Sequence, residues 1–419
     1  MSDPLAPPAA STGPAGGWVA RNLPALAYRD FRLLWAGVLF ASGGLWVQNV
    51  TVGWLVYTLT GSSVLLGLLN GIGVIPWLFV SPVAGAMADR IDRRFLLLGA
   101  SAVLVTAALI IGALTATGHV EVWHLYVFVL VSGCAWSVDQ PVRQAMVGSS
   151  VPREVIANAV ALNSAGFNLS RIVGPGVAGL MIAFLGAGGN FFVQAAAFAG
   201  VGLTVWAMAS APPRRGAAAQ SVLSNMKAGF RWVWGNAPAR MLMMLALTPF
   251  FLGFPFLSLM PIFAEDVLKI GPSGLGLLLA ANGVGALSGA MLMAAVGPKR
   301  RRGPFLMAML GCMGVSLVAF SLMDSLPVAL LCLVVVGVCQ MCYAATNMTR
   351  LQLLVPDEYR GRAMSIFMLN NAFFPLGSLT AGIVAGFIGA PSTVTLMGVS
   401  CVLLAAGAAY FSRTLRNLE

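Results

Sequence analysis

The ten residues GAMADRIDRR, at positions 85–94, decide how this chain is built. An almost wholly apolar run leads into them, and two acids and three arginines then follow within positions 89–94. Charged side chains are expensive inside a bilayer and are rare there. The stretch therefore marks the end of a membrane-spanning segment, and its charges either anchor that end or take part in a mechanism.

The composition indicates a polytopic membrane protein. Of the 419 residues, 59% are apolar and only 9% are charged, and the mean hydropathy is +0.88, whereas soluble domains carry about 25% charged residues. The net charge of +11 does not indicate nucleic-acid binding, because all of the 24 Lys and Arg residues except Lys269 and Arg171 fall in segments expected on one side of the membrane. This bias places the basic side, and both termini with it, in the cytoplasm.

Apolar segments of the length needed to cross a bilayer, about 20 residues, recur along the whole chain. We therefore expect an all-α membrane protein with twelve transmembrane helices, at 33–57, 63–87, 95–117, 122–145, 157–185, 189–210, 239–264, 273–296, 304–323, 326–348, 363–388 and 391–411.

The longest internal connection divides these spans six and six. Its second part, SVLSNMKAGFRWVW, has apolar residues at helical spacing beside Lys227 and Arg231, which is typical either of an amphipathic helix at the membrane surface or of an ordinary linker. The expected organisation is a disordered cytoplasmic tail (1–22), an N-terminal six-helix bundle (23–210), a cytoplasmic linker (211–238), a C-terminal six-helix bundle (239–411) and a cytoplasmic tail (412–419).

The two halves resemble each other. Gly61-Ser-Ser before the second span matches Gly271-Pro-Ser before the eighth, and Val151-Pro before the fifth matches Val355-Pro before the eleventh. Two parallel six-helix repeats with a site at their interface are typical of an alternating-access transporter.

The architecture and the opening stretch together resemble the major facilitator superfamily. Its signature between helices 2 and 3 is G-x-x-x-D-R-x-G-R-R. Asp92 stands at the second glycine, and the matching residues are Gly85, Asp89, Arg90, Arg93 and Arg94. The resemblance implies the major facilitator fold, with two pseudo-symmetric bundles.

Two further stretches resemble exporters within that superfamily. Helix 5 carries a form of the exporter motif G-x-x-x-G-P-x-x-G-G, in which Gly174, Pro175 and Gly179 match. Asp139-Gln-Pro-Val-Arg143, followed by Arg171 in helix 5, is similar to enterobactin-type siderophore exporters and related drug exporters. This implies a monomeric exporter of an amphiphilic small molecule, a siderophore or drug, in the bacterial inner membrane, contacting membrane lipids and driven by proton exchange.

The resemblance also implies a conformational latch. Asp89 would meet the positive N-terminus of helix 11, near Gly361 and Arg362, when the cytoplasmic side is closed. Arg93 would pair with Asp139 on helix 4. Asp139 lies well inside a span, so it is a functional candidate, and its alternatives are a local pair with Arg143 or direct proton binding.

Polar and aromatic side chains inside the spans are candidates for the substrate cavity. Without charge, they suit a large, amphiphilic and roughly neutral substrate, and hydrogen bonding between helices is the alternative for each. The set comprises Gln48, Asn49, Trp54, Asn163, Asn168, Asn282, Gln340, Tyr343, Asn347, Asn370, Asn371 and Phe374.

Other classes of function have less support. The chain has only two histidines, His119 and His124, and no nucleophile or metal-binding constellation accompanies them, so we expect neither an enzyme nor a cofactor or metal site. No phosphate-binding G-x-x-x-x-G-K-[ST] loop is present, so ATP is not the expected energy source. A lipid or lysophospholipid transporter of the same fold and a non-transporting sensor are the alternatives.

The latch predicts the effect of one substitution. Asp89→Asn removes the charge that would meet the helix 11 N-terminus, so transport should slow while the amount of protein in the membrane stays the same. Flux and membrane abundance measured together test this, and undiminished transport would discard the latch.

Overall fold

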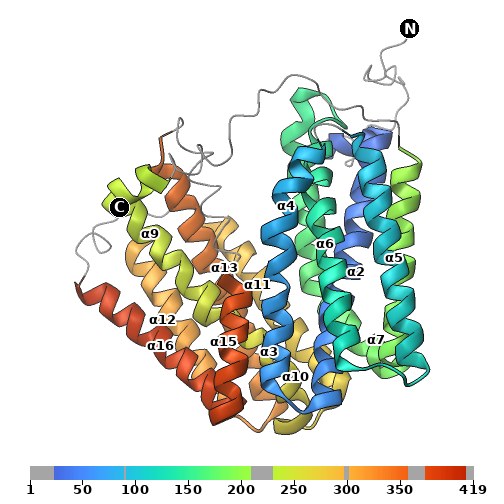
Figure 1. Cartoon of the computed structure of the whole chain (residues 1–419). Coiled ribbons are helices and arrows are strands. Elements are labelled where there is room, and N and C mark those ends of the chain that lie inside the picture. Colours follow the sequence, from blue (N-terminus) through green and yellow to red (C-terminus); the bar gives the residue numbers. More distant parts are fainter. Residues whose placement is uncertain (1–22, 89–90, 209–229, 297–301, 357–372, 412–419) are drawn as a thin grey trace, which may run out of the picture. The chain divides into compact units, whose positions relative to one another are not determined.

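A computed structural model describes residues 23–88, 91–208, 230–296, 302–356 and 373–411. All regular structure in these residues is helical (Figure 1). Within them, ten helices are long and apolar enough to cross a membrane, and Phe373–Ile388 is a shorter apolar helix. The predicted all-α membrane class is therefore confirmed.

The chain forms two compact units. Unit 1 comprises Met1–Thr51, Ile75–Gly174 and Leu185–Gly216, and unit 2 comprises Val52–Val74, Pro175–Phe184 and Ala217–Glu419. The unit boundaries thus pass through three of the predicted spans. The division into two six-helix bundles stays a prediction.

Unit 1 contains the helices of the first part of the chain. Its core brings together apolar side chains such as Phe31, Leu97 and Phe198 from three helices. The helices that supply the unit are α2 (Arg29–Thr60), α4 (Val74–Ala88), α5 (Arg93–Ala116), α6 (Val122–Val147) and α7 (Ile156–Trp206). The short turn η1 (Pro24–Ala27) precedes α2, and η2 (Arg153–Val155) precedes α7.

Helix α7 accounts for two of the predicted spans. Its backbone leaves helical geometry at Gly186 (φ 70°, ψ 171°), which is a conformation that glycine adopts without steric cost. The expected spans 157–185 and 189–210 therefore exist on either side of this residue. Gly389, 203 positions later, has φ 85°, and Gly61 and Gly271, 210 positions apart, have φ 61° and 64°. The internal repeat is thus visible in backbone geometry.

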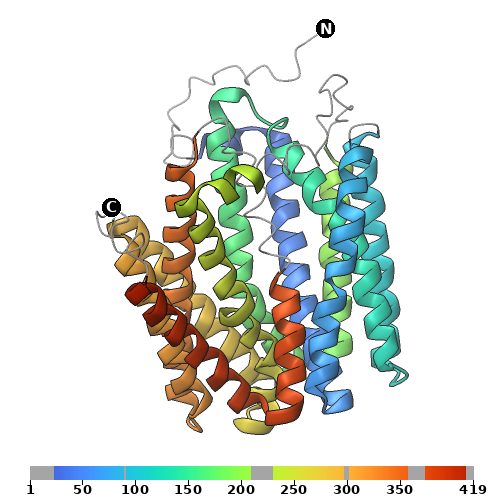
Figure 2. The same ribbon diagram turned by 60° about the vertical axis from the view of Figure 1, so that its left-hand side comes forward.

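Unit 2 contains the remaining helices, which Figure 2 shows from a second side. Within it α11 packs on α13, α12 on α13 and α16, and α15 on α3. The elements are α3 (Ser63–Ile72), α9 (Ala237–Thr248), η3 (Pro249–Gly253), η4 (Pro255–Leu259), α10 (Met260–Ile262), η5 (Phe263–Val267), α11 (Gly271–Val296), α12 (Arg302–Ser321), α13 (Leu326–Leu354), α15 (Phe373–Ile388) and α16 (Ala390–Phe411).

Two predicted spans are not single α-helices. The span expected at 63–87 is divided into α3 and α4 at Gly73. Pro76 has no N–H, so the carbonyl of Ile72 lacks its usual helical donor. The span expected at 239–264 consists of α9, η3, η4, α10 and η5, with two π-helical turns (η3 and η5); we call this segment helix 7.

Side chains of α13 donate hydrogen bonds to backbone carbonyl groups of helix 7. Pro249 cannot donate to the carbonyl of Leu245, four residues earlier, and the Tyr343 hydroxyl donates to that carbonyl instead, at 2.7 Å. The carbonyl of Gly253 accepts a hydrogen bond from Nε2 of Gln340 at 3.0 Å. Because carbonyl groups cannot be left unpaired in a membrane interior, α13 is what allows helix 7 to be irregular.

The segment that precedes helix 7 is amphipathic where the structure describes it. Residues 230–235 are helical. The rings of Phe230 and Trp234 are both exposed and stack with centroids 5.1 Å apart, whereas Val233 is buried against Leu242 and Leu351. This favours the amphipathic helix over an ordinary linker for these six positions; residues 209–229 lie outside the described chain.

The hydrogen bond from Tyr343 to the backbone of helix 7 gives a stability prediction. Tyr343→Phe removes one oxygen and leaves the Leu245 carbonyl buried without a donor, which should cost about 1–3 kcal/mol and lower the apparent Tm in detergent. Tyr28→Phe is the matched control, because the Tyr28 hydroxyl makes no hydrogen bond within the described chain. Equal Tm values for the two variants would contradict a stabilising role of the Tyr343 hydrogen bond.

Candidate functional site

A buried ion pair lies on one face of α6. Asp139 and Arg143 are one helical turn apart, and such i, i+4 positions are neighbours on a helix surface. The Arg143 Nε atom donates to Oδ2 of Asp139 at 3.0 Å, and Nη2 donates to Oδ1 at 2.6 Å. The side chains are only 2% and 6% exposed. This bidentate geometry is the one in which guanidinium and carboxylate bind most strongly.

A glycine on α2 makes room for the guanidinium. A methyl group added to Gly37 would lie 2.8 Å from Nη1 of Arg143 and 2.9 Å from Oγ1 of Thr204. No side chain other than hydrogen fits there without displacing the arginine. Nη1 has no hydrogen-bond partner among the residues described, so the pair keeps one donor unused.

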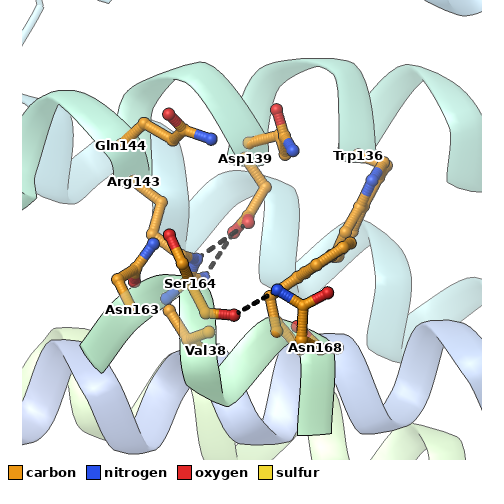
Figure 3. A pocket seen from close by; sticks show the side chains of 12 residues that line it. Val38, Trp136, Asp139, Arg143, Gln144, Asn163, Ser164 and Asn168 are labelled. Carbon is orange, nitrogen blue, oxygen red and sulfur yellow. Dashed lines mark hydrogen bonds and ion pairs between the residues drawn. The ribbon is translucent and has the colours of Figure 1, made fainter. Parts of the chain in front are cut away.

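The ion pair forms part of the wall of a cavity of about 200 Å³ between α2, α6 and α7 (Figure 3). Asn168 Nδ2 donates to the carbonyl of Ser164 at 2.8 Å across one turn of α7. The cavity combines two aromatic rings, four amide side chains and one ion pair, and its lining residues are Val38, Ala41, Ser42, Trp136, Asp139, Gln140, Arg143, Gln144, Asn163, Ser164, Phe167 and Asn168.

The structure brings together four of the predicted site residues, Asp139, Arg143, Asn163 and Asn168, around this cavity. Sequence reasoning missed most of the other lining residues, including Trp136, Gln140 and Phe167. A signal existed, because positions 136, 140 and 143 follow helical spacing on α6 and positions 163, 164, 167 and 168 follow it on α7.

The latch residues are only partly described. Asp89, Arg90, Gly361 and Arg362 lie outside the described residues, while Gly85 is in α4 and Arg93 begins α5. Within the described chain, Asp139 pairs with Arg143 and not with Arg93. The local pair is therefore the one formed in this structure, and the expected Arg93–Asp139 pair is absent from these residues. The latch as a whole stays a prediction.

One predicted cavity residue lies instead in a buried polar network of unit 1. Gln48 Nε2 donates to Oγ of Ser132 at 2.9 Å, and Gln194 Nε2 donates to Oε1 of Gln48 at 2.6 Å. One turn away, Asn190 Nδ2 donates to Oγ1 of Thr51 at 2.9 Å. All five side chains are at most 7% exposed. Gln48 thus joins α2, α6 and α7 by hydrogen bonds in this structure, and its role in a substrate cavity stays a prediction.

Four predicted cavity residues of unit 2 also act between helices. Asn282 Nδ2 donates to Oε1 of Gln340 at 3.2 Å, and Asn347 Nδ2 donates to the carbonyl of Leu242 at 3.3 Å. Gln340 and Tyr343 bind the helix 7 backbone as described above. In this structure these four side chains therefore form hydrogen bonds between helices, and their role in a substrate cavity stays a prediction.

The remaining predicted cavity residues differ in exposure. Trp54 is buried, Phe374 is half-buried and Asn49 is exposed, whereas Asn370 and Asn371 lie outside the described residues.

Arg171 continues the polar face of α7. Positions 164, 168 and 171 have the i, i+4, i+7 spacing of one helix face. Arg171 is half-buried near the middle of the predicted fifth span, and no acid among the described residues pairs with it. An arginine at this depth is costly unless a charged or polar group accompanies it.

The glycines of the helix 5 motif are at close contacts between helices. A methyl group on Gly174 would lie 2.7 Å from Cβ of Trp46, and one on Gly179 would lie 2.8 Å from the carbonyl oxygen of Pro272. Small residues at these positions let the helices approach closely. The exporter role of the motif stays a prediction.

The described residues contain no cluster of three or more His, Cys, Asp or Glu side chains that could hold a metal ion. The six cysteines are free thiols. The cavity is lined by hydrogen-bonding groups, two aromatic rings and the Asp139–Arg143 ion pair.

The described helices are those of a multi-pass helical membrane protein. The family model described as transmembrane secretion effector matches residues 20–419. The chain therefore belongs to this family of the major facilitator superfamily. It is a secretion transporter and not an enzyme, as the sequence resemblance predicted.

Curated relatives cover nearly the whole chain. The multidrug efflux pump Tap of Mycolicibacterium fortuitum is 27% identical over 92% of this chain and 96% of its own length. The staphyloferrin A transporter of Staphylococcus aureus is 24% identical over 89% and 94%. The macrolide efflux protein A of Streptococcus pyogenes is 21% identical over 90% and 94%.

Solved structures support the fold. The nucleoside transporter NupG superposes with a TM-score of 0.70 at 13% identity, covering 91% of this chain and 100% of its own. A bacterial homologue of the human lysosomal transporter Spinster, in an inward-facing and unoccupied conformation, gives 0.70 at 17% identity, covering 93% and 98%.

The buried ion pair predicts an asymmetry between single and double substitutions. Asp139→Leu leaves Arg143 buried without its counter-charge, which should cost about 3–5 kcal/mol. Adding Arg143→Met removes the unpaired charge, so the double variant should recover most of the lost Tm in detergent. If the double variant is less stable than Asp139→Leu alone, the pair is not the source of the loss.

Proposed function

We propose that the protein exports amphiphilic small molecules, siderophores or drugs, across the bacterial cytoplasmic membrane, and that Arg171 binds the anionic oxygen group of those substrates that carry one. Export proceeds by alternating access in exchange for protons, and both termini lie in the cytoplasm. Relatives named as a multidrug efflux pump, a staphyloferrin A transporter and a macrolide efflux protein support this range of substrates.

Arg171 is the observation that carries the substrate class. It is a charged side chain in the middle of a predicted span, and no carboxylate within the described chain offsets its charge. Asp139, the acid that lies inside a span on the neighbouring helix α6, already binds Arg143 through both oxygens. An anionic group on the substrate would supply the missing counter-charge for Arg171.

The neighbouring cavity suits the rest of such a molecule. Trp136 and Phe167 offer apolar surface, and Gln140, Gln144 and Asn163 offer hydrogen bonds. Small-molecule sites combine apolar surface with polar groups that fix the orientation of the ligand. A cavity of about 200 Å³ holds only part of a large amphiphile, so we assign to it one portion of the substrate.

Two features of the sequence support proton exchange as the energy source. The chain has no phosphate-binding loop for ATP. It does have an intramembrane acid, Asp139, which is a group of the kind that proton relays use. In this structure that acid is held in an ion pair, so a proton would have to compete with Arg143.

The experiment is flux into everted vesicles with an imposed pH gradient. We expect transport of staphyloferrin A, which carries carboxylates, and of the cationic dye rhodamine 6G. Arg171→Gln should slow staphyloferrin A transport at least about tenfold, because a hydrogen bond between charged groups is lost, and should leave rhodamine 6G transport unchanged. Arg171→Lys should keep most of the activity.

Arg153→Gln is the matched control, since Arg153 is an exposed arginine on the η2 turn outside the cavity. It should behave as the unmodified protein with both probes. An equal loss with both probes for Arg171→Gln would reject charge recognition. Transport that ignores the pH gradient would reject proton exchange.

A further inference from the structure

The hydroxyl group of Tyr57 donates a hydrogen bond to Oδ2 of Asp266. Both residues belong to unit 2. Tyr57 lies in the last turn of α2 and is 5% exposed, whereas Asp266 lies on η5 and is exposed. Only the hydroxyl of a buried ring reaches the carboxylate, so the bond joins the ends of α2 and helix 7 directly.

The π-helical turn at the end of helix 7 aims Asp266 at α2. Pro261 of helix 7 faces α2, since a methyl group on Gly53 would lie 3.9 Å from its Cγ. In a regular α-helix, a residue five positions later would point well away from that face. In η5 the Leu268 N–H donates to the carbonyl of Phe263 at 2.8 Å, and this i→i+5 pattern brings position 266 back towards α2.

In the same unit, two pairs of helices cross with their backbones in direct contact at glycine residues. Where α3 crosses α15, a methyl group on Gly67 would lie 2.9 Å from Cα of Gly382. Where the Pro175–Phe184 segment of α7 crosses α11, a methyl group on Gly276 would lie 3.0 Å from Cα of Gly179. Contacts this short leave no room for a side chain, so the segments from the first part of the chain are held tightly against the second part.

We propose that the Tyr57–Asp266 hydrogen bond is a latch that holds this end of the transporter closed, and that it must break in each transport cycle. The inference rests on the proposed function, which makes this end, opposite the basic loops, the outer one. Tyr57 is then a positioning residue, because it acts on the equilibrium between closed and open states and need not touch the substrate.

The glycine crossings and the latch contribute in different ways. Backbone packing at Gly67 and Gly382 supplies close contact without a directional bond. The latch is a hydrogen bond to a carboxylate, which is stronger than one between neutral groups. Its loss should shift the equilibrium towards the outward-open state by roughly tenfold.

The test measures access to a thiol introduced by Ser378→Cys. Ser378 is fully buried on α15, and its carbonyl oxygen lies 3.0 Å from a methyl group placed on Gly67. An impermeant maleimide added to spheroplasts should label this thiol slowly in the parent. Adding Tyr57→Phe should speed the labelling roughly tenfold, and the chain without Ser378→Cys gives the background from the native cysteines.

Three comparisons make the outcome decisive. Asp266→Ala should match Tyr57→Phe, and the double variant should add nothing further, because both changes break one bond. Tyr28→Phe at the other end of α2 and Glu265→Ala beside Asp266 should label at the parent rate. Labelling of Tyr57→Phe at the parent rate, or additive effects in the double variant, would overturn the latch.

The measurement needs no substrate, so it is independent of the substrate class. Everted vesicles expose the opposite side of the membrane. Faster labelling there, and not in spheroplasts, would reject the proposed orientation and leave the latch itself supported. Failure of both staphyloferrin A and rhodamine 6G to be transported, with faster labelling in spheroplasts, would reject the proposed substrates alone.

Discussion

Hydrogen bonds from α13 to the backbone of helix 7 are the interaction on which unit 2 depends. Prolines at 249, 255 and 261 deprive helix 7 of three N–H groups, and a membrane interior offers no water to replace them. Tyr343 donates to the carbonyl of Leu245, which Pro249 leaves without a donor, and Gln340, one turn away on α13, donates to the carbonyl of Gly253. The irregular backbone of helix 7 around Pro249 and Gly253 is tolerated because a neighbouring helix supplies these donors.

Unit 1 contains buried charged groups, which also need partners inside the membrane. A single buried acid or arginine is strongly unfavourable, and the chain places the two four residues apart on α6 so that each neutralises the other. Gly37 supplies the space for the arginine. Arg171 has no such partner within the described chain, which is why it, and not the Asp139–Arg143 pair, defines the proposed substrate.

Much of the architecture could be predicted from the sequence, because the length of an apolar run directly determines whether a helix can span a bilayer. The separation of the spans 157–185 and 189–210 followed from their combined length, and the repeat was visible in the match of Gly61 with Gly271. The subdivision of helix 7 was not, since its stability depends on Tyr343 and Gln340 in a distant segment. The partners of the polar residues could not be predicted for the same reason: Gln48 and Asn282 are polar inside spans, but only tertiary packing decides that they bind other helices.

The glycine crossings have a consequence for evolution. Gly67 and Gly276 are 209 positions apart and Gly179 and Gly382 are 203 apart, so the two crossings occupy matching places in the internal repeat. After duplication of an ancestral six-helix segment, each crossing would have inherited the same requirement for glycine. A bulky replacement at one crossing would separate the same layer of helices as a replacement at the other, and selection would act on the four glycines as one unit. Tyr57 and Asp266, also 209 positions apart, occupy matching places too but are chemically different, so the internal repeat by itself does not produce this hydrogen bond.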